Sequence, residues 1–328
     1  MAQTVANSPQ SQLAILLVIY SSTITYAVVN EQTIRSKADC AGVGLHSGVK
    51  VGLRLLPAPP GSGVVFRRTD LDNFEVEATG RNVARVSYAT SLMKKGVLIS
   101  TTEHLLAALM GMGIDNALVE LDNLELPILD GSAQPFVEMI LAAGIRKQRR
   151  RRTYMRILRA VELREGSKFI AIYPAESYSV SYRINFPHPL IGAETYTAEL
   201  TPEVFRREIA PARTFGSLQE ERALRNMGLI RGVSQENCIV LDRDSVTNGP
   251  LRYPDEFVRH KMLDLIGDLA LLGRRILGRV VADRAGHAMH TAMVAMLLRD
   301  RSLWEAATVD ESADQPRSEL PLAASTLA

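Results

Sequence analysis

The chain has 328 residues, enough for one large domain or two of ordinary size, each with an apolar core. It is 46% hydrophobic and 23% charged, which excludes a wholly disordered chain, and its net charge of +2 gives no global field for nucleic acid. Its two cysteines, Cys40 and Cys238, are far apart, which argues against a disulfide scaffold or a thiolate zinc site and fits a reducing compartment.

Residues 13–29 form an uncharged, largely apolar run that is marginally short for a membrane span. The first basic residue is Arg35, so the positive region that begins a signal peptide is missing. A weak membrane anchor, an extra strand or helix, and a translation start assigned too early all remain open. We favour a dispensable extension over residues 1–30.

The first half of the chain is expected to be a mixed α+β domain over residues 31–145. In chain order we expect strands over 32–56 and 64–68, mixed strand and loop over 73–99, a helix over 101–112, a strand over 117–121 and a helix over 133–143. Ser100 and Glu103 match a capping box for the first helix, and Gly144 is a natural end for the second.

Six of the seven residues in 146–152 are basic. Such a run can bind nucleic acid or acidic lipid, but no aromatic residue interleaves with it for base stacking. Because it falls between two similar halves, we interpret it as a solvated linker.

The second half is expected to be a similar α+β domain over residues 153–304, followed by a disordered tail over 305–328. We expect strands over 154–158, 169–173, 178–186, 196–200, 213–216, 237–242 and 280–282, and helices over 201–208, 217–228, 257–272 and 288–298. Each half thus has strands, a helix, a strand and a helix, which suggests a duplicated layered α+β fold.

His260, Asp264 and Asp268 recur every four residues along one predicted helix. Each step of four turns about 40° and rises about 6 Å, so an imidazole and two carboxylates line one face. A histidine at i and an aspartate at i+4 can hold one divalent cation. An isolated pattern of this kind is more often a solvated face, so it needs support from elsewhere in the chain.

Glu103 and His104, in an apolar setting at the start of a predicted helix, give that support. Neighbouring helical residues point about 100° apart, so one can bind an ion while the other reaches a bound water. Together with His260 and Asp264, His104 completes a set of two histidines and one carboxylate. Hydrolytic zinc sites use three such protein ligands, but Fe(II) accepts the same set, so these residues leave the metal open.

Further polar residues are candidates for the same site. Asp268 can accept the second N–H of a histidine, and His287 follows a glycine that allows close approach of a ligand. Lys261 and Thr214 can stabilise negative charge that develops on an oxygen. As single residues each is more often structural, and no ligand role is expected for His46, His188 or His290.

Seven short motifs follow one another along the chain between about Glu31 and about Asp300. They are residues 43–48, 102–106, 127–133, 213–216, 255–264, 266–269 and 286–288. Together they resemble the UDP-3-O-acyl-N-acetylglucosamine deacetylase family, which removes an N-acetyl group in the committed step of lipid A synthesis in Gram-negative bacteria. A difference from that pattern is His290, where a polar amide is expected.

The resemblance implies a zinc-dependent amidohydrolase of two similar α+β domains, each a sheet layered against helices, with the active site between them. It assigns the metal to His104, His260 and Asp264, with Zn2+ expected and Fe2+ also possible. Glu103 is implied to be the general base that activates the attacking water.

The same resemblance assigns the remaining candidates. His287 would protonate the leaving amine, and Asp268 would orient His287. Thr214 and Lys261 would stabilise the oxyanion and bind substrate, and Phe215 would line the substrate path.

The segment from about 217 to 240 matches an insert that forms an apolar passage for the acyl chain. Its apolar residues are Leu218, Leu224, Met227, Leu229 and Ile230. Taken without the resemblance, these side chains could equally form a small satellite core.

The resemblance also implies a UDP-linked acylated glucosamine as substrate, no nucleic acid, at most peripheral membrane association and a monomer. It implies a cytoplasmic location, near the inner membrane face because the substrate has a lipid tail. Two other classes of function remain open. One is a different metallo-amidase or an inactive relative. The other is a membrane-tethered or nucleic-acid-binding protein, which residues 13–29 and 146–152 would support.

Overall fold

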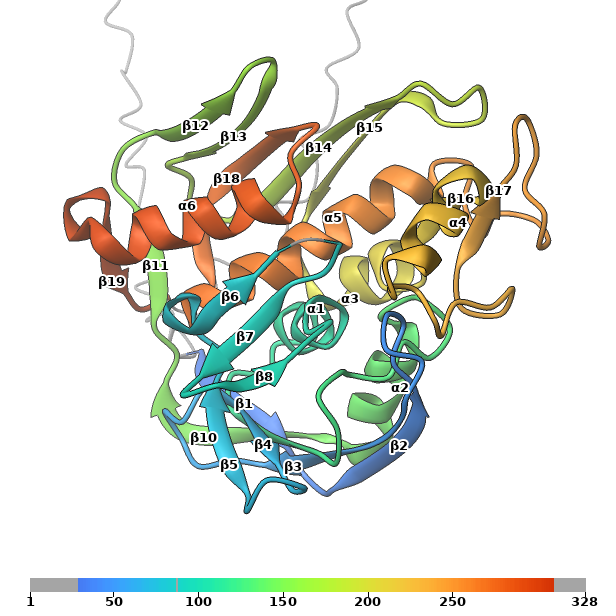
Figure 1. Cartoon of the computed structure of the whole chain (residues 1–328). Helices are drawn as coiled ribbons and strands as arrows, with labels where there is room; N and C mark the ends of the chain where they lie inside the picture. The colour runs from blue at the N-terminus through green and yellow to red at the C-terminus, as the bar shows by residue number, and fades with distance from the viewer. Residues whose placement is uncertain (1–28, 87, 310–328) are drawn as a thin grey trace, which may run out of the picture.

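A computed structural model describes residues 29–86 and 88–309 and shows an α+β fold. Two large sheets, one from each half of the chain, lie on opposite sides of the main helices (Figure 1). The predicted extension over 1–30 and the predicted tail over 305–328 lie almost entirely outside the described residues. At their described ends, Asn30 starts the first strand and residues 305–307 belong to the last strand.

The first half forms a five-stranded sheet in which inward apolar side chains alternate with outward residues. Its strands, in spatial order, are β2 (Ala38–Val43), β3 (Lys50–Pro57), β9 (Ala117–Leu121), β4 (Val64–Arg68) and β5 (Phe74–Glu77). In β3 the buried residues are Val51, Leu53 and Leu55, the period of two expected for a sheet with one face on the core. A smaller sheet contains β6 (Val83–Arg85), β7 (Ser91–Lys94) and β8 (Val97–Ile99).

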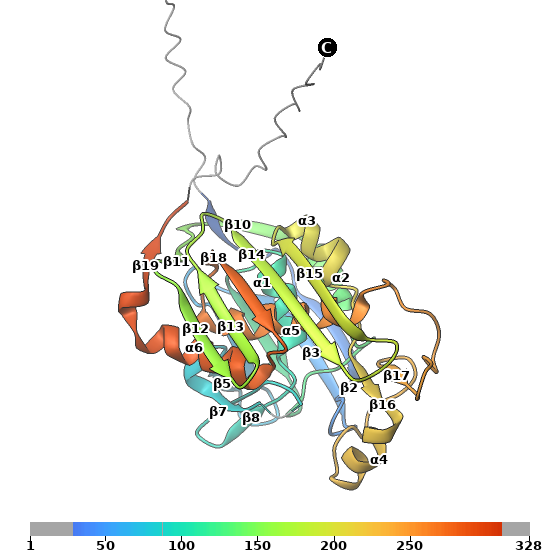
Figure 2. The same cartoon turned by 90° about the horizontal axis from the view of Figure 1, so that it is seen from above.

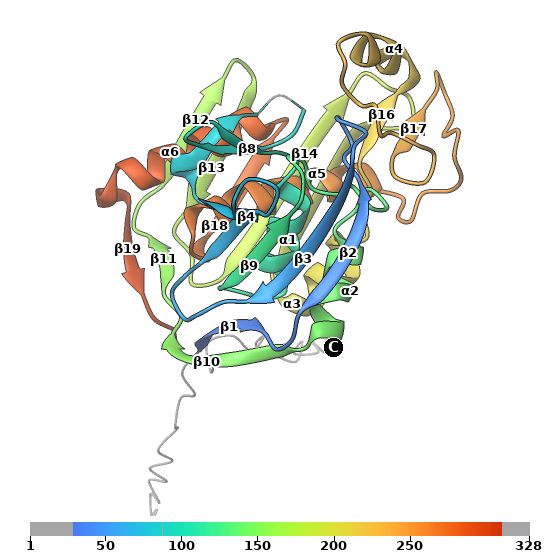
Figure 3. The same ribbon diagram turned by 60° about the horizontal axis from the view of Figure 1, so that its bottom comes forward.

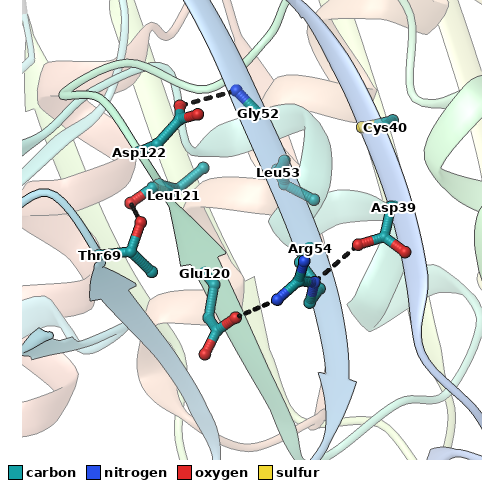
Figure 4. Close-up of a pocket in the computed structure, with 9 residues that line it drawn as sticks. All are labelled: Asp39, Cys40, Gly52, Leu53, Arg54, Thr69, Glu120, Leu121 and Asp122. Atoms are coloured by element: carbon teal, nitrogen blue, oxygen red, sulfur yellow. Dashed lines mark hydrogen bonds and ion pairs between the residues drawn. The ribbon is translucent and has the colours of Figure 1, made fainter.

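The outer face of the five-stranded sheet carries a row of alternating charges. Arg54 Nε lies 2.7 Å from Asp39 Oδ1, and Arg54 Nη1 lies 3.4 Å from Glu120 Oε2 (Figure 4). Glu120 also pairs with Arg67, and Arg67 with Glu75. The hollow in Figure 4 is therefore lined by paired charges rather than by candidate site residues. Because these pairs meet solvent, we expect them to weaken in high salt.

The second half forms a seven-stranded sheet seen face-on in Figure 2. Its strands are β11 (Tyr154–Ile157), β12 (Val161–Glu165), β13 (Lys168–Tyr173), β14 (Tyr178–Phe186), β15 (Gly192–Glu199), β18 (Ile276–Asp283) and β19 (Trp304–Ala307). Strand β18 pairs with β11, β13 and β14. An insert contains β16 (Phe215–Ser217), α4 (Leu218–Asn226) and β17 (Ile239–Leu241), and the short α3 (Pro202–Val204) precedes it.

Four helices lie between the two sheets. They are α1 (Glu103–Gly111), α2 (Gln134–Ala143), α5 (Glu256–Leu269) and α6 (His287–Arg299). Helices α1 and α5 pack closely because α5 has a glycine at the crossing: a Cβ atom on Gly267 would lie 2.0 Å from the carbonyl oxygen of Glu103. In the described part of the chain, no helix combines the length and the apolar character needed to span a membrane.

Most of the basic run 146–152, which we interpreted as a solvated linker, is a paired strand. Residues Ile145–Arg151 form β10, which runs antiparallel to β1 (Asn30–Ile34) across one end of the molecule (Figure 3). Gln148 points inward, accepting a hydrogen bond from Asn116 Nδ2 at 2.7 Å and donating one to the Ala58 carbonyl at 2.8 Å. The run does connect the two halves, but its single uncharged side chain anchors it to the first.

The predicted capping box is not formed. Helix α1 begins at Glu103 rather than at residue 101, and the side chain of Thr102 does not cap it. Ser100 Oγ instead lies 3.0 Å from Ser91 Oγ, and the Glu103 carboxylate accepts a hydrogen bond from the Thr90 amide at 3.1 Å. The Glu103 side chain therefore does not cap the helix but points into the protein interior.

A buried ion pair follows the basic strand and predicts a sharp difference between two neighbouring arginines. Arg152 donates from Nε and Nη2 to the Asp115 carboxylate, with its shortest contact at 2.8 Å, whereas Arg151 is exposed. Arg152→Met leaves a largely buried carboxylate unpaired, so we expect the free energy of unfolding to fall by about 3 kcal/mol. Arg151→Met should change it by less than about 0.5 kcal/mol. Urea unfolding monitored by circular dichroism measures both, and equal effects would contradict the assignment.

Candidate active site

The four-residue spacing on α5 places its polar residues on one buried face. His260, Asp264 and Asp268 are 2%, 3% and 0% exposed. The opposite face packs apolar side chains against the core, so α5 holds ionisable groups inside the protein without solvent. Groups buried in this way must be paired with other groups or with an ion.

His104 from α1 meets this face and completes the first cluster. Its Nε2 lies 3.6 Å from Asp264 Oδ1, and His260 Nε2 lies 3.3 Å from the same oxygen. The Nδ1–H of His260 donates to the Ala212 carbonyl at 3.0 Å, which fixes the tautomer and leaves the lone pair of Nε2 directed at the carboxylate. Burial lowers the pKa of His260 to about 4, so the ring is neutral at pH 7.

These contacts fit a divalent cation. A neutral imidazole lone pair that faces a buried carboxylate oxygen is repelled by it unless a positive charge lies between them. Tetrahedral ligands about 2.05 Å from a metal are separated by roughly 3.3 Å, close to the distances in this cluster. His104, His260 and Asp264, whose ligand atoms all lie within 4.8 Å of one another, are therefore able to hold a metal.

A second cluster beside the first has hydrogen-bond distances instead. His287 Nδ1 lies 2.7 Å and His290 Nδ1 lies 2.8 Å from Asp268 Oδ2. Both distances suit N–H groups that donate to a carboxylate. We therefore interpret this cluster as held together by hydrogen bonds rather than by a metal ion. Burial alone would lower the pKa of His287, but the adjacent Asp268 carboxylate raises it to about 9.

Glu103 lies at the start of α1, next to His104 of the first cluster, and is 3% exposed. Burial raises the pKa of its carboxyl group. Thr90 donates from its amide to Glu103 Oε2 and from its hydroxyl to Asp268 Oδ1, the latter at 2.5 Å. Thr90 therefore bridges Glu103 and the second cluster.

Of the other predicted residues, Lys261 and Phe215 contact the first cluster directly. Lys261 donates to Asp264 Oδ2 at 2.8 Å, and its Nζ lies 5.8 Å from the centre of the Phe215 ring. The Phe215 ring packs edge-on to His260, with ring centres 6.3 Å apart. Thr214 precedes Phe215, and both residues line a cavity next to the insert.

The insert encloses that cavity, which has a volume of about 150 Å³. Of the residues predicted to line an acyl passage, Leu224 and Ile230 do so, whereas Met227 is 61% exposed. The insert is fixed to the first half by the amides of Arg231 and Gly232, which donate to the carbonyls of His46 and Leu45. Phe215 lines this cavity and also packs against His260, so it lies between the cavity and the first cluster.

Two buried residues of the site were not predicted from the sequence. His290 is three residues after His287 on α6, so helical spacing alone could have placed both on one face. Thr90 gives no such signal, because it is 178 residues from Asp268 along the chain.

Comparison with known proteins places the chain in one family. Residues 31–299 match the family model described as LpxC, UDP-3-O-acyl N-acetylglycosamine deacetylase. A protein of Solibacter usitatus with the name UDP-3-O-acyl-N-acetylglucosamine deacetylase is 52% identical over 286 residues, covering 87% of this chain and 97% of that protein. Proteins of the same name from Myxococcus xanthus and Marinobacter nauticus are 46% and 42% identical, covering 84% and 89% of this chain and 88% and 97% of theirs. The chain therefore belongs to the LpxC family of deacetylases.

Proposed function

We propose that the protein hydrolyses the N-acetyl group of a UDP-3-O-(3-hydroxyacyl)-N-acetylglucosamine and releases acetate, in the committed step of lipid A biosynthesis. The observation that carries the proposal is the pair of imidazole nitrogens directed at the buried Asp264 oxygen, at 3.3 and 3.6 Å, beside a carboxyl group and a cationic histidine. This arrangement supplies the ligands, the base and the acid of a metal-assisted amide hydrolysis. The location that goes with this role is the cytoplasm.

His104, His260 and Asp264 would hold Zn2+, with Fe2+ as the alternative for the same ligands. A cation held there would supply a Lewis acid for the amide carbonyl and for the attacking water. Glu103, adjacent to His104, would take the proton of that water.

On the leaving-group side, His287 would donate a proton to the amine nitrogen as the C–N bond breaks. The Nδ1–H of His287 donates to Asp268, with Nδ1 2.7 Å from Oδ2. The other ring nitrogen, Nε2, would therefore be the one that faces the substrate. Lys261 and the hydroxyl of Thr214 would bind the carbonyl oxygen as negative charge develops on it.

The cavity inside the insert would take the acyl chain, and Phe215 would separate that chain from the metal cluster. The apolar lining from Leu224, Ile230 and Val240 suits methylene groups. A UDP-linked substrate and a monomeric enzyme, with membrane association peripheral at most, complete the proposal.

The metal and base roles can be separated by two substitutions. His260→Ala removes a ligand and should lower both the metal content and turnover. Glu103→Gln keeps the three ligands, so we expect a normal metal content with turnover reduced by about 10²–10⁴-fold, since a general base is lost. Metal analysis paired with a deacetylation assay on UDP-3-O-acyl-N-acetylglucosamine measures both. A metal-free wild type that does not deacetylate this substrate would refute the proposed mechanism.

The acid role predicts a pH dependence. A protonated His287 is required, so kcat/KM should fall as the pH rises through the pKa of His287, which is about 9. A bound divalent cation beside Asp264 would lower that pKa, so the loss should occur at or below about pH 9. In His287→Ala the residual activity should show no such fall. A basic limb that persists unchanged in this variant would exclude His287 as its source.

The acyl passage can be tested with matched substitutions on α4. Leu224 lines the cavity, whereas its neighbour Ala223 is exposed. Leu224→Trp should lower kcat/KM on a long-chain substrate by about tenfold or more and have less effect on a short-chain one, because the added ring fills the cavity. Ala223→Trp adds even more bulk outside the cavity and should leave both values unchanged. A loss that does not depend on chain length would argue for a satellite core instead.

A further inference from the structure

His290 is a buried histidine that the mechanism above does not use. It lies on α6, three residues after His287, and is 1% exposed. A polar side chain buried to this extent must have its hydrogen bonds satisfied inside the protein. The partners of its two ring nitrogens therefore indicate its role.

On one side, His290 contacts the carboxylate that orients His287. Its Nδ1 lies 2.8 Å from Asp268 Oδ2, the oxygen that also accepts from His287 Nδ1 at 2.7 Å. The hydroxyl of Thr90 donates to the other oxygen, Oδ1, at 2.5 Å. Asp268 thus receives donors from three side chains, and a carboxylate has about four acceptor positions for them.

On the other side, His290 contacts the central sheet of the second half. Its Nε2 lies 3.2 Å from the hydroxyl of Tyr182 on β14, and that hydroxyl donates to the Ala285 carbonyl at 2.6 Å. Tyr182 is fully buried, and burial raises the pKa of its hydroxyl well above 10, so the proton stays on the oxygen. A neutral His290 can share that proton at Nε2 while it donates its Nδ1–H to Asp268. Its ring is fixed at both ends.

A metal in this cluster would require different distances. Two nitrogen atoms within 2.8 Å of one carboxylate oxygen are closer than ligand pairs around a cation, which are roughly 3.3 Å apart. The same two distances are ideal for N–H groups that donate to a carboxylate. The geometry therefore favours a hydrogen-bonded cluster over a second ion.

We propose that His290 is a positioning residue that locks the Asp268 carboxylate in the rotamer needed to orient His287. The terminal torsion of an aspartate has broad preferences, and Thr90 holds Oδ1 while His287 contacts Oδ2. The bond from His290, anchored in turn on Tyr182, is the second constraint on Oδ2, the oxygen that orients His287. The inference rests on the function proposed above, in which His287 is the acid.

The test compares three variants on α6. His290→Leu removes both hydrogen bonds at similar volume, and His290→Asn keeps an N–H donor at the position of Nδ1. Met293→Leu, at a fully buried residue one turn further along, is the control for disturbing the helix. We expect His290→Leu to lower kcat by about 10–100-fold, the usual effect of losing an outer hydrogen-bond partner. KM and metal content should stay within about twofold, and His290→Asn and Met293→Leu should retain most of the kcat.

Unchanged kcat in His290→Leu, a loss that His290→Asn does not restore, or an equal loss in Met293→Leu would each overturn the proposal. So would a wild type that binds two metal ions and loses one of them in His290→Leu. If His290→Leu fails to fold, nitrogen-15 NMR of the wild type decides, since the proposal requires the Nδ1–H tautomer for His290 and the Nε2–H tautomer excludes it. Wild-type turnover tests the proposed function itself. If the wild type shows no turnover but His290 has the Nδ1–H tautomer, the proposed function is refuted while the hydrogen bond from His290 to Asp268 stands.

Discussion

The close crossing of α1 and α5 is the constraint on which the site depends. Glycine inside a helix costs about 1 kcal/mol relative to alanine, yet α5 has Gly267 in its last turn, between Asp264 and Asp268. Any side chain there would meet the backbone of Glu103, 2.0 Å from the new Cβ atom. It would push α1 away and separate His104 from the two ligands on α5. The glycine thus sets the distance between His104 and the two α5 residues that complete the candidate metal site.

One helix face then supports two kinds of chemistry through its two aspartates. Asp264 faces two imidazole Nε2 atoms at distances that suit a shared cation, while Asp268, one turn further, faces imidazole N–H groups at hydrogen-bond distances. The difference lies in which ring nitrogen each histidine presents, and the partner of its other nitrogen decides that. The Ala212 carbonyl does this for His260. Neutral and cationic histidines can therefore lie side by side in one buried space.

The sequence predicted those parts of the fold and site that depend on local spacing. The long helices were correct in type and nearly in extent, and the face formed by His260, Asp264 and Asp268 followed from the helical period alone. The basic strand β10 was not predicted, because pairing with the distant β1 overrides the weak strand preference of its charged residues. Thr90 was missed for a related reason, since its bond to Asp268 joins residues far apart in the chain. Contacts of this kind are set by tertiary packing.

The division of the site between the two halves also constrains how the enzyme matures. His104 is synthesised with the first half, and the two remaining ligands follow only when α5 is made. The first half contains every strand of its five-stranded sheet but only one of the three candidate ligands, His104, which alone would bind metal weakly. Loading of the ion would therefore be a late event that follows docking of the halves. Once bound, the ion would act as a cross-link between α1 and α5 and slow their separation.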